Sequence, residues 1–209
     1  MVSYRGIEAN PKKIRAIEAM RPPARIKDVL KLTGSLAALS RFISRLAERA
    51  LPFFKLLQKS GPFSWTEEAE QAFQELKQHL VSLPILVALE PGEPLYLYIA
   101  ADVEAVSMVL VAERATQEGQ GPEGLEPTTE VWIVQKLVYY VSEVLHEAKA
   151  RYLEMHKLLY AVLVASRKLR HYFQANRVVV VTSFPLRAIL HNSNATGNIA
   201  KWAAELAEF

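Results

Sequence analysis

The spacing of the hydrophobic residues changes a little before the middle of the chain. In the first part they recur every three or four positions, as Val29, Leu32 and Leu36 do, which is typical of one side of a helix. In the second part apolar and aromatic residues form runs that favour strands, and a short polar turn separates the runs 94–99 and 106–111. The pattern predicts a helical first part, followed by a sheet with this hairpin at its centre.

Caps and prolines indicate where the helices of the first part begin and end. Asn10 followed by Pro11 is a typical helix start, and Thr66 followed by several glutamates is another. From Ile26 to Leu46 the apolar positions alternate between steps of three and four, which predicts one helix there. The expected helices are 11–20, 26–46, 53–57 and 67–80.

The second part continues with strands and helices in alternation. After the hairpin, a stretch rich in Gly, Pro, Glu and Thr over 115–130 reads as an exposed loop. The elements that we expect after it are a strand at 131–141, a long helix at 150–173, a buried strand at 177–182, a helical turn at 185–191 and a last helix from about 199.

Composition excludes several classes of protein. A chain of 209 residues with 51% apolar residues is able to bury a sizeable core, and it has no cysteine for disulfides, thiolate nucleophiles or cysteine-ligated zinc. No apolar run is long enough to cross a bilayer, and the N-terminus does not resemble a secretory signal. We therefore expect no membrane partner and an intracellular location, cytoplasmic or nuclear.

Charge is distributed unevenly along the chain. Residues 1–60 contain 13 Lys and Arg against four Asp and Glu, whereas the remainder contains 12 against 18. A basic segment of this kind favours contact with the phosphates of nucleic acid. The alternative is that these cations only solvate the outer faces of helices.

Short motifs in both parts resemble one known family. The resemblance covers nearly the whole chain, in the same order. In the first part it rests on Lys-Asp-Val-Leu-Lys-Leu-Thr-Gly at 27–34, Leu-Pro-Phe-Phe-Lys-Leu-Leu at 51–57 and Phe-Ser-Trp-Thr at 63–66. These resemble the segment after the polymerase palm in Pol polyproteins of gypsy-type LTR retrotransposons. In the second part, Val-Tyr-Tyr-Val-Ser at 138–142 and Arg-Lys-Leu-Arg-His-Tyr-Phe at 167–173 resemble the ribonuclease H domain that follows, in the variety found in plant elements.

The resemblance implies an α/β (α+β) fold with three segments. They are the end of a palm at 1–15, a helical thumb and connection module at 16–90, and a ribonuclease H-like mixed sheet with helices at 91–209 that lacks its last strand. The paired aspartates of a polymerase palm are not in this sequence, which contains no Tyr-x-Asp-Asp. We therefore expect that the chain does not polymerise DNA by itself.

Ribonuclease H chemistry requires clustered carboxylates that hold magnesium at the scissile phosphate. The resemblance places the first three carboxylates of the family at Ala100, His156 and Ser183, and none of these residues is acidic. We expect no catalytic residue, no metal site and no cofactor, and magnesium would be expected only in an active relative. His156 on its own is expected to be a packing or surface residue.

An alternative is a hybrid ribonuclease with displaced carboxylates. The chain has only two aspartates, Asp28 and Asp102. Asp102 lies two positions after Ala100, and Glu104 or Glu154 would have to approach it. Because magnesium needs fixed oxygen ligands, we expect Asp102 to be a turn residue instead.

The basic helices supply the remaining functional candidate. In the resembled polymerases the thumb lies along the template-primer duplex, and Lys27, Lys31, Arg41, Arg45 and Arg49 fall in that region. Phosphate contact of this kind is independent of sequence and weakens with salt. The chain is thus interpreted as a non-catalytic, Pol-derived binder of the RNA/DNA duplex backbone. A second alternative is a protein-interaction module that docks a partner, such as another Pol segment, on its ribonuclease H-like sheet.

Overall fold

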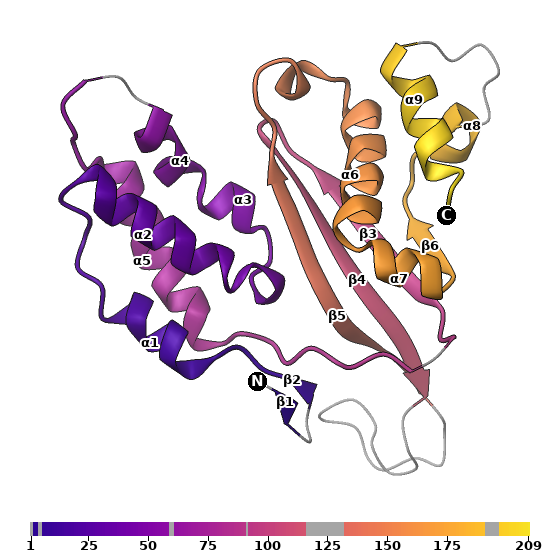
Figure 1. The fold of residues 1–209 in the computed structure, drawn as a ribbon, viewed down its shortest axis with the longest axis horizontal. Coiled ribbons are helices and arrows are strands. Elements are labelled where there is room, and N and C mark those ends of the chain that lie inside the picture. Colours follow the sequence, from indigo (N-terminus) through magenta and orange to yellow (C-terminus); the bar gives the residue numbers. More distant parts are fainter. Residues whose placement is uncertain (1, 4–5, 59–60, 91, 116–131, 191–196) are drawn as a thin grey trace.

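A computed structural model describes residues 2–3, 6–58, 61–90, 92–115, 132–190 and 197–209. Figure 1 shows two parts side by side: a group of helices and a sheet whose far side carries further helices. We call residues 11–81 the helical module and residues 95–206 the sheet module. The N-terminal strands β1 (Val2–Ser3) and β2 (Gly6–Ile7) pair antiparallel, and Ile7 bridges to Leu86.

The helical module packs five α-helices around one apolar cluster. Caps expected from the sequence are present, since the side chain of Asn10 accepts from the Lys12 N–H and that of Thr66 from the Ala69 N–H. The helices are α1 (Pro11–Glu18), α2 (Ile26–Ala37), α3 (Leu46–Arg49), α4 (Leu51–Gln58) and α5 (Glu67–Val81), with a 3₁₀ turn η1 (Ser40–Phe42).

The single helix expected from Ile26 to Leu46 is wrong. Helix α2 ends at Ala37, η1 follows, and Arg45 adopts a left-handed conformation with φ of 54° before α3 begins. Phe42 and Ile43 are both buried. The chain turns here because the apolar residues after α2 enter the core from a new direction, and this turn carries α3 to the sheet.

The sheet contains four strands in the order β5-β4-β3-β6. Strands β3 and β4 pair antiparallel, as do β4 and β5, whereas β3 and β6 are parallel. The hairpin predicted at the centre of the sheet is confirmed. The strands are β3 (Leu95–Ala101), β4 (Ala105–Ala115), β5 (Ile133–Val144) and β6 (Val178–Val181).

Helix α6 covers one face of this sheet, and α9 packs against α6 (Figure 1). The long helix expected at 150–173 is wrong in its bounds: α6 begins at Glu154 and ends at Lys168, and α7 starts after a break at Leu169. Leu169 is buried, and the break lets Tyr172 reach the Tyr139 ring edge-on. The remaining helical elements are η2 (Lys149–Arg151), α7 (Arg170–Ala175), α8 (Leu186–Leu190) and α9 (Gly197–Leu206).

The helical module lies against the edge strand β5, which η1 and α3 contact. Across this boundary the Ala47 N–H donates to Ser142 Oγ at 2.9 Å, and the Val87 N–H donates to the Leu137 carbonyl at 2.8 Å. Lys55 and Glu104 form an ion pair at 3.2 Å. We call these contacts the seam, and through Val87 they satisfy one backbone group of the edge strand, the Leu137 carbonyl.

Two further expectations from the sequence concern the loop at 115–130 and membrane-spanning helices. The expected loop at 115–130 falls, apart from its first residue, outside the described residues. Among the described helices, none is both long and apolar enough to cross a bilayer.

Lys157 joins α6 to the hairpin. Its side chain is buried, and its ammonium donates to the carbonyls of Asp102 and Val103 at 3.0 and 2.8 Å. Hydrogen bonds to a charged group stabilise more than neutral ones. Lys157→Met is expected to lower the free energy of unfolding in urea by about 1.5–3 kcal/mol. The matched variant Lys201→Met, at an exposed position of α9, should change it by less than about 0.5 kcal/mol, and equal effects would contradict the role of Lys157.

Candidate functional site

A pocket of about 390 Å³ lies where β3 and β6 end side by side. Ala100 and Ser183, two of the three positions expected from the resemblance, both line this pocket. The strands bring them together because β3 and β6 are parallel neighbours, with Tyr98 opposite Val181. The ends of parallel strands at one sheet edge are where many α/β proteins place a site.

Besides the ends of β3 and β6, helix α6 lines the pocket. His156, the third position expected from the resemblance, is not among the lining residues. Glu154 and Leu158 line it instead, one helical turn apart. His156 lies between them in sequence, and two residues along a helix turn a side chain to another face. The sequence match missed this by two positions. Because residues 157–166 of α6 are all buried, the helix is covered on every side there, and the apolar pattern does not show which side faces the pocket.

Acidic groups do not converge on this pocket. Glu154 is the single carboxylate lining it. Asp102 lines a neighbouring hollow together with Arg45 and Glu48, and this hollow shares Ala100 and Ala101 with the pocket. Glu104, the other neighbour considered, pairs with Lys55. Within the described ranges, no group of three or more His, Asp or Glu side chains is placed to hold a metal ion. The pocket therefore offers a magnesium ion one carboxylate, whereas ribonuclease H chemistry needs a cluster of them.

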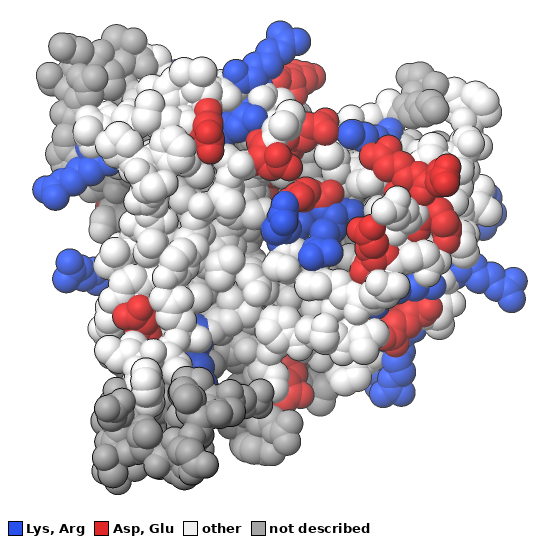
Figure 2. Space-filling view, turned by 180° about the vertical axis from the view of Figure 1, so that it is seen from behind, with Lys and Arg blue, Asp and Glu red and all other residues white. Residues whose placement is uncertain are grey.

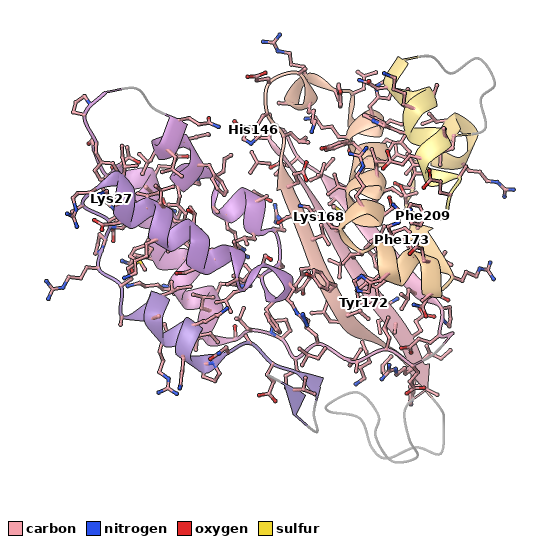
Figure 3. All side chains as sticks on the ribbon, viewed as in Figure 1. Lys27, His146, Lys168, Tyr172, Phe173 and Phe209 are labelled. Atoms are coloured by element: carbon pink, nitrogen blue, oxygen red, sulfur yellow. The ribbon has the colours of Figure 1, made fainter. Side chains whose placement is uncertain are left out.

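The five cations expected to contact phosphate fall into two groups. Lys27 and Lys31 lie one turn apart on α2 and are exposed, and Figure 3 shows Lys27 on the outer side of the helical module, away from β5. Neither forms an ion pair with any described residue. These two lysines are free to meet a polyanion.

The three arginines are engaged within the protein. The Arg41 guanidinium lies over the rings of Phe42 and Tyr139, 5.4 and 5.6 Å from their centroids. Arg45 binds Glu48 through two hydrogen bonds. Arg49 Nε donates to the carbonyl of Ser44. Their charges are thus partly occupied in holding the turn before α3 and the seam.

Sequence matching also missed cations on α1 and on the connection to α2. These side chains are exposed, and no described residue forms an ion pair with them. The excess of Lys and Arg in residues 1–60 indicates these cations, whereas the family motifs indicate only those of the thumb segment. Together with the two lysines of α2 they form what we call the α1–α2 basic surface: Lys12, Lys13, Arg15, Arg21, Lys27 and Lys31.

Comparison with known proteins places the sheet module in one family. The family model described as the RNase H-like domain found in reverse transcriptase matches residues 90–209. This span includes every strand of the sheet and the pocket described above. The gypsy-type and plant-type assignment stays a prediction.

Curated relatives are Pol polyproteins. The retrovirus-related Pol polyprotein from transposon opus of Drosophila melanogaster is 28% identical over the whole of this chain. The Transposon Tf2-3 polyprotein of Schizosaccharomyces pombe is 24% identical over 95% of it. The chain spans 20% and 13% of the lengths of these two proteins.

Solved structures share the fold at low sequence identity. The foamy viral protease-reverse transcriptase dRH in complex with double-stranded DNA has a TM-score of 0.72 at 14% identity, covering 100% of this chain and 35% of that one. The foamy viral protease-reverse transcriptase in complex with an RNA/DNA hybrid has a TM-score of 0.72 at 15% identity, covering 98% and 26%. The α/β fold expected from the sequence is confirmed.

Restoring acidic side chains tests whether this pocket is the vacated metal site. Ala100 and Ser183 are exposed, so Ala100→Asp with Ser183→Asp should fold and place two carboxylates beside Glu154. We expect the double variant to bind Mn²⁺ saturably in electron paramagnetic resonance titrations, whereas the parent chain should not.

Adding Glu154→Gln to this double variant should weaken Mn²⁺ binding about tenfold or more, because one charged ligand is lost. A folded double variant that binds Mn²⁺ no better than the parent chain would show that the three positions do not converge as ligands.

Proposed function

This chain belongs to the family of RNase H-like domains found in reverse transcriptase, and we propose that it is a non-catalytic member that binds the backbone of a nucleic-acid duplex. The binding surface that we propose is the α1–α2 basic surface. Two observations support the proposal together. The α1–α2 basic surface carries exposed cations without ion-pair partners among the described residues, and the pocket at β3 and β6 contains a single carboxylate.

Loss of hybrid cleavage follows from the chemistry of the pocket. Two-metal hydrolysis needs several carboxylates to hold the ions that activate water and stabilise the leaving oxygen. Ala100, Leu158 and Ser183 supply a methyl, an isobutyl and a hydroxyl group where such ligands would stand. Glu154 alone does not replace them.

Support for duplex binding comes from charge and from the structural neighbours. Six exposed cations on α1, α2 and the segment between them would contact phosphates without reading base sequence. Two proteins that share the fold were solved with double-stranded DNA and with an RNA/DNA hybrid. Because identity to them is 14–15%, we carry duplex binding over to this chain only as a proposal.

The geometry changes which residues should matter for binding. Lys27 and Lys31 keep the role proposed from the sequence, and Lys12, Lys13 and Arg15 join them. Arg41 is assigned to the seam, since its guanidinium packs against Tyr139. Substituting it should weaken the seam more than it weakens binding.

Charge reversal on α2 tests the binding surface. Lys27→Glu with Lys31→Glu should weaken binding of a labelled RNA/DNA hybrid at least tenfold at low salt. It should also lower the slope of log K against log salt by about 2, because each phosphate contact contributes roughly 0.9. Fluorescence anisotropy over a series of salt concentrations measures both quantities.

The matched control reverses two exposed lysines of the sheet module, Lys136→Glu with Lys201→Glu, at the same net charge. If this control loses as much affinity and slope as the α2 variant, binding depends on net charge and the assigned surface is wrong. A parent chain whose binding does not respond to salt would remove the proposal altogether.

The hybrid-nuclease alternative has its own assay. The Glu154 carboxylate in the pocket is the observation in its favour. Incubating the chain with labelled hybrid and Mg²⁺ or Mn²⁺ should leave the hybrid intact. Metal-dependent cleavage that disappears in Glu154→Gln or Asp102→Ala would establish a displaced site and overturn the non-catalytic proposal.

A protein-interaction role is the second candidate, and one face of the sheet favours it. The face that turns away from α6 shows a broad area with few charges in Figure 2. On it Tyr98 and Val181 are each 36% exposed, although both belong to the sheet. Because the chain spans about a fifth of the Pol polyprotein of transposon opus, another Pol segment is the partner that we propose for this face.

A further inference from the structure

The pocket at β3 and β6 carries a negative charge that no cation of the described chain neutralises by direct contact. Of the residues that line it, Glu154 is charged and the others are neutral. Glu154 is the first residue of α6, is exposed, and forms no ion pair with a described residue. A ligand that enters the pocket therefore meets one carboxylate without a partner.

Cations close to the pocket are engaged by other groups. Lys157, one turn further along α6, is buried and donates to two carbonyls of the hairpin between β3 and β4. In the neighbouring hollow, Arg45 binds Glu48 through two hydrogen bonds, and Asp102 adds a further carboxylate. Even with Lys157 included, the carboxylates around the pocket and the hollow outnumber the cations, so the pocket favours a positively charged ligand.

Hydroxyl oxygens line the same pocket. Ser183 is exposed, and its hydroxyl has no hydrogen-bond partner among the described residues. Thr182 Oγ1 accepts from the Phe184 N–H at 3.1 Å, and a hydroxyl oxygen is able to accept a second hydrogen bond. Together with Glu154 these groups supply acceptors, and no lysine or arginine is among the lining residues. An ammonium group, which has three N–H donors and no acceptor, matches this set.

Apolar side chains form the rest of the pocket wall. They come from both strand ends, from α6 and from the segment after β6: Ile99, Ala100, Ala101, Leu158, Val181 and Phe184. A volume of about 390 Å³ is in the range that holds small organic ligands. Apolar walls with a few polar groups are the usual character of a ligand site, and these walls would contact an aliphatic or aromatic body.

We propose that this pocket binds a small organic amine, with the protonated amino group at Glu154 and the two hydroxyls, and the body of the amine against the apolar wall. The Glu154 carboxylate would repel an anion. A divalent metal ion would lack the further carboxylates that it needs, whereas the single charge of an ammonium group is balanced by one carboxylate. The inference is independent of nucleic-acid binding, which we assign to the α1–α2 basic surface.

Three probes that share a phenyl ring and differ in charge test the proposal: phenethylamine, phenethyl alcohol and phenylacetate. In nuclear magnetic resonance titrations of the isotope-labelled chain with EDTA present, the amine should shift the backbone N–H signals of Ala100, Glu154 and Ser183 saturably. The alcohol should bind about tenfold more weakly because it lacks the charge, and phenylacetate should not bind. Equal affinities for the amine and the alcohol, or saturable shifts confined to another surface, would overturn the proposal.

Glu154→Gln removes the charge and keeps the size of the side chain. It should weaken binding of phenethylamine about tenfold and leave binding of phenethyl alcohol unchanged. The matched control is Glu67→Gln, because Glu67 is the exposed first residue of α5 as Glu154 is of α6, and it should change neither affinity. A folded Glu154→Gln variant that binds the amine as the parent chain does, or an equal loss in the control, would refute the contact with Glu154.

Discussion

The seam between the helical module and β5 is the constraint on which the rest of the structure depends. A β-strand at the edge of a sheet presents unpaired backbone groups. Here the Val87 N–H pairs with the Leu137 carbonyl of β5, and η1 and α3 pack against the same strand. The Ala47 N–H, at the start of a four-residue helix, is satisfied by Ser142 Oγ. Two apolar clusters, one in each module, are thereby joined along one strand.

This arrangement also decides which charges are available for binding. Arg41 is taken up between Phe42 and Tyr139, so a cation that the sequence presents as a phosphate ligand instead ties η1 to β5. Lys27 lies on the outer side of the helical module, and Lys27 and Lys31 both stay exposed. The same seam leaves the sheet face with few charges open (Figure 2). The surfaces that we propose for binding are thus ones that the seam does not occupy.

The sequence predicts the elements well and the breaks between them poorly. The hairpin of β3 and β4 is readable because alternation and turn chemistry are local. The ends of α2 at Ala37 and of α6 before Leu169 cannot be read from the sequence. The apolar spacing continues through both positions, and only tertiary packing changes the direction of the chain there. The positions of Ala100 and Ser183 in the pocket can be predicted because both lie at strand ends. Whether His156 or Leu158 faces the pocket depends on how α6 is rotated over the sheet, and the periodicity of apolar residues does not fix that rotation.

The central claim is that the seam holds the two modules in one fixed arrangement, and a distance measurement between them tests it most directly. The chain has no cysteine, so Gln78→Cys on α5 and Gln174→Cys on α7, both exposed, accept spin labels without background. Double electron–electron resonance should give one narrow distance distribution, which Ser142→Ala with Arg41→Ala should broaden. A broad or two-peaked distribution in the otherwise unaltered chain would contradict the account.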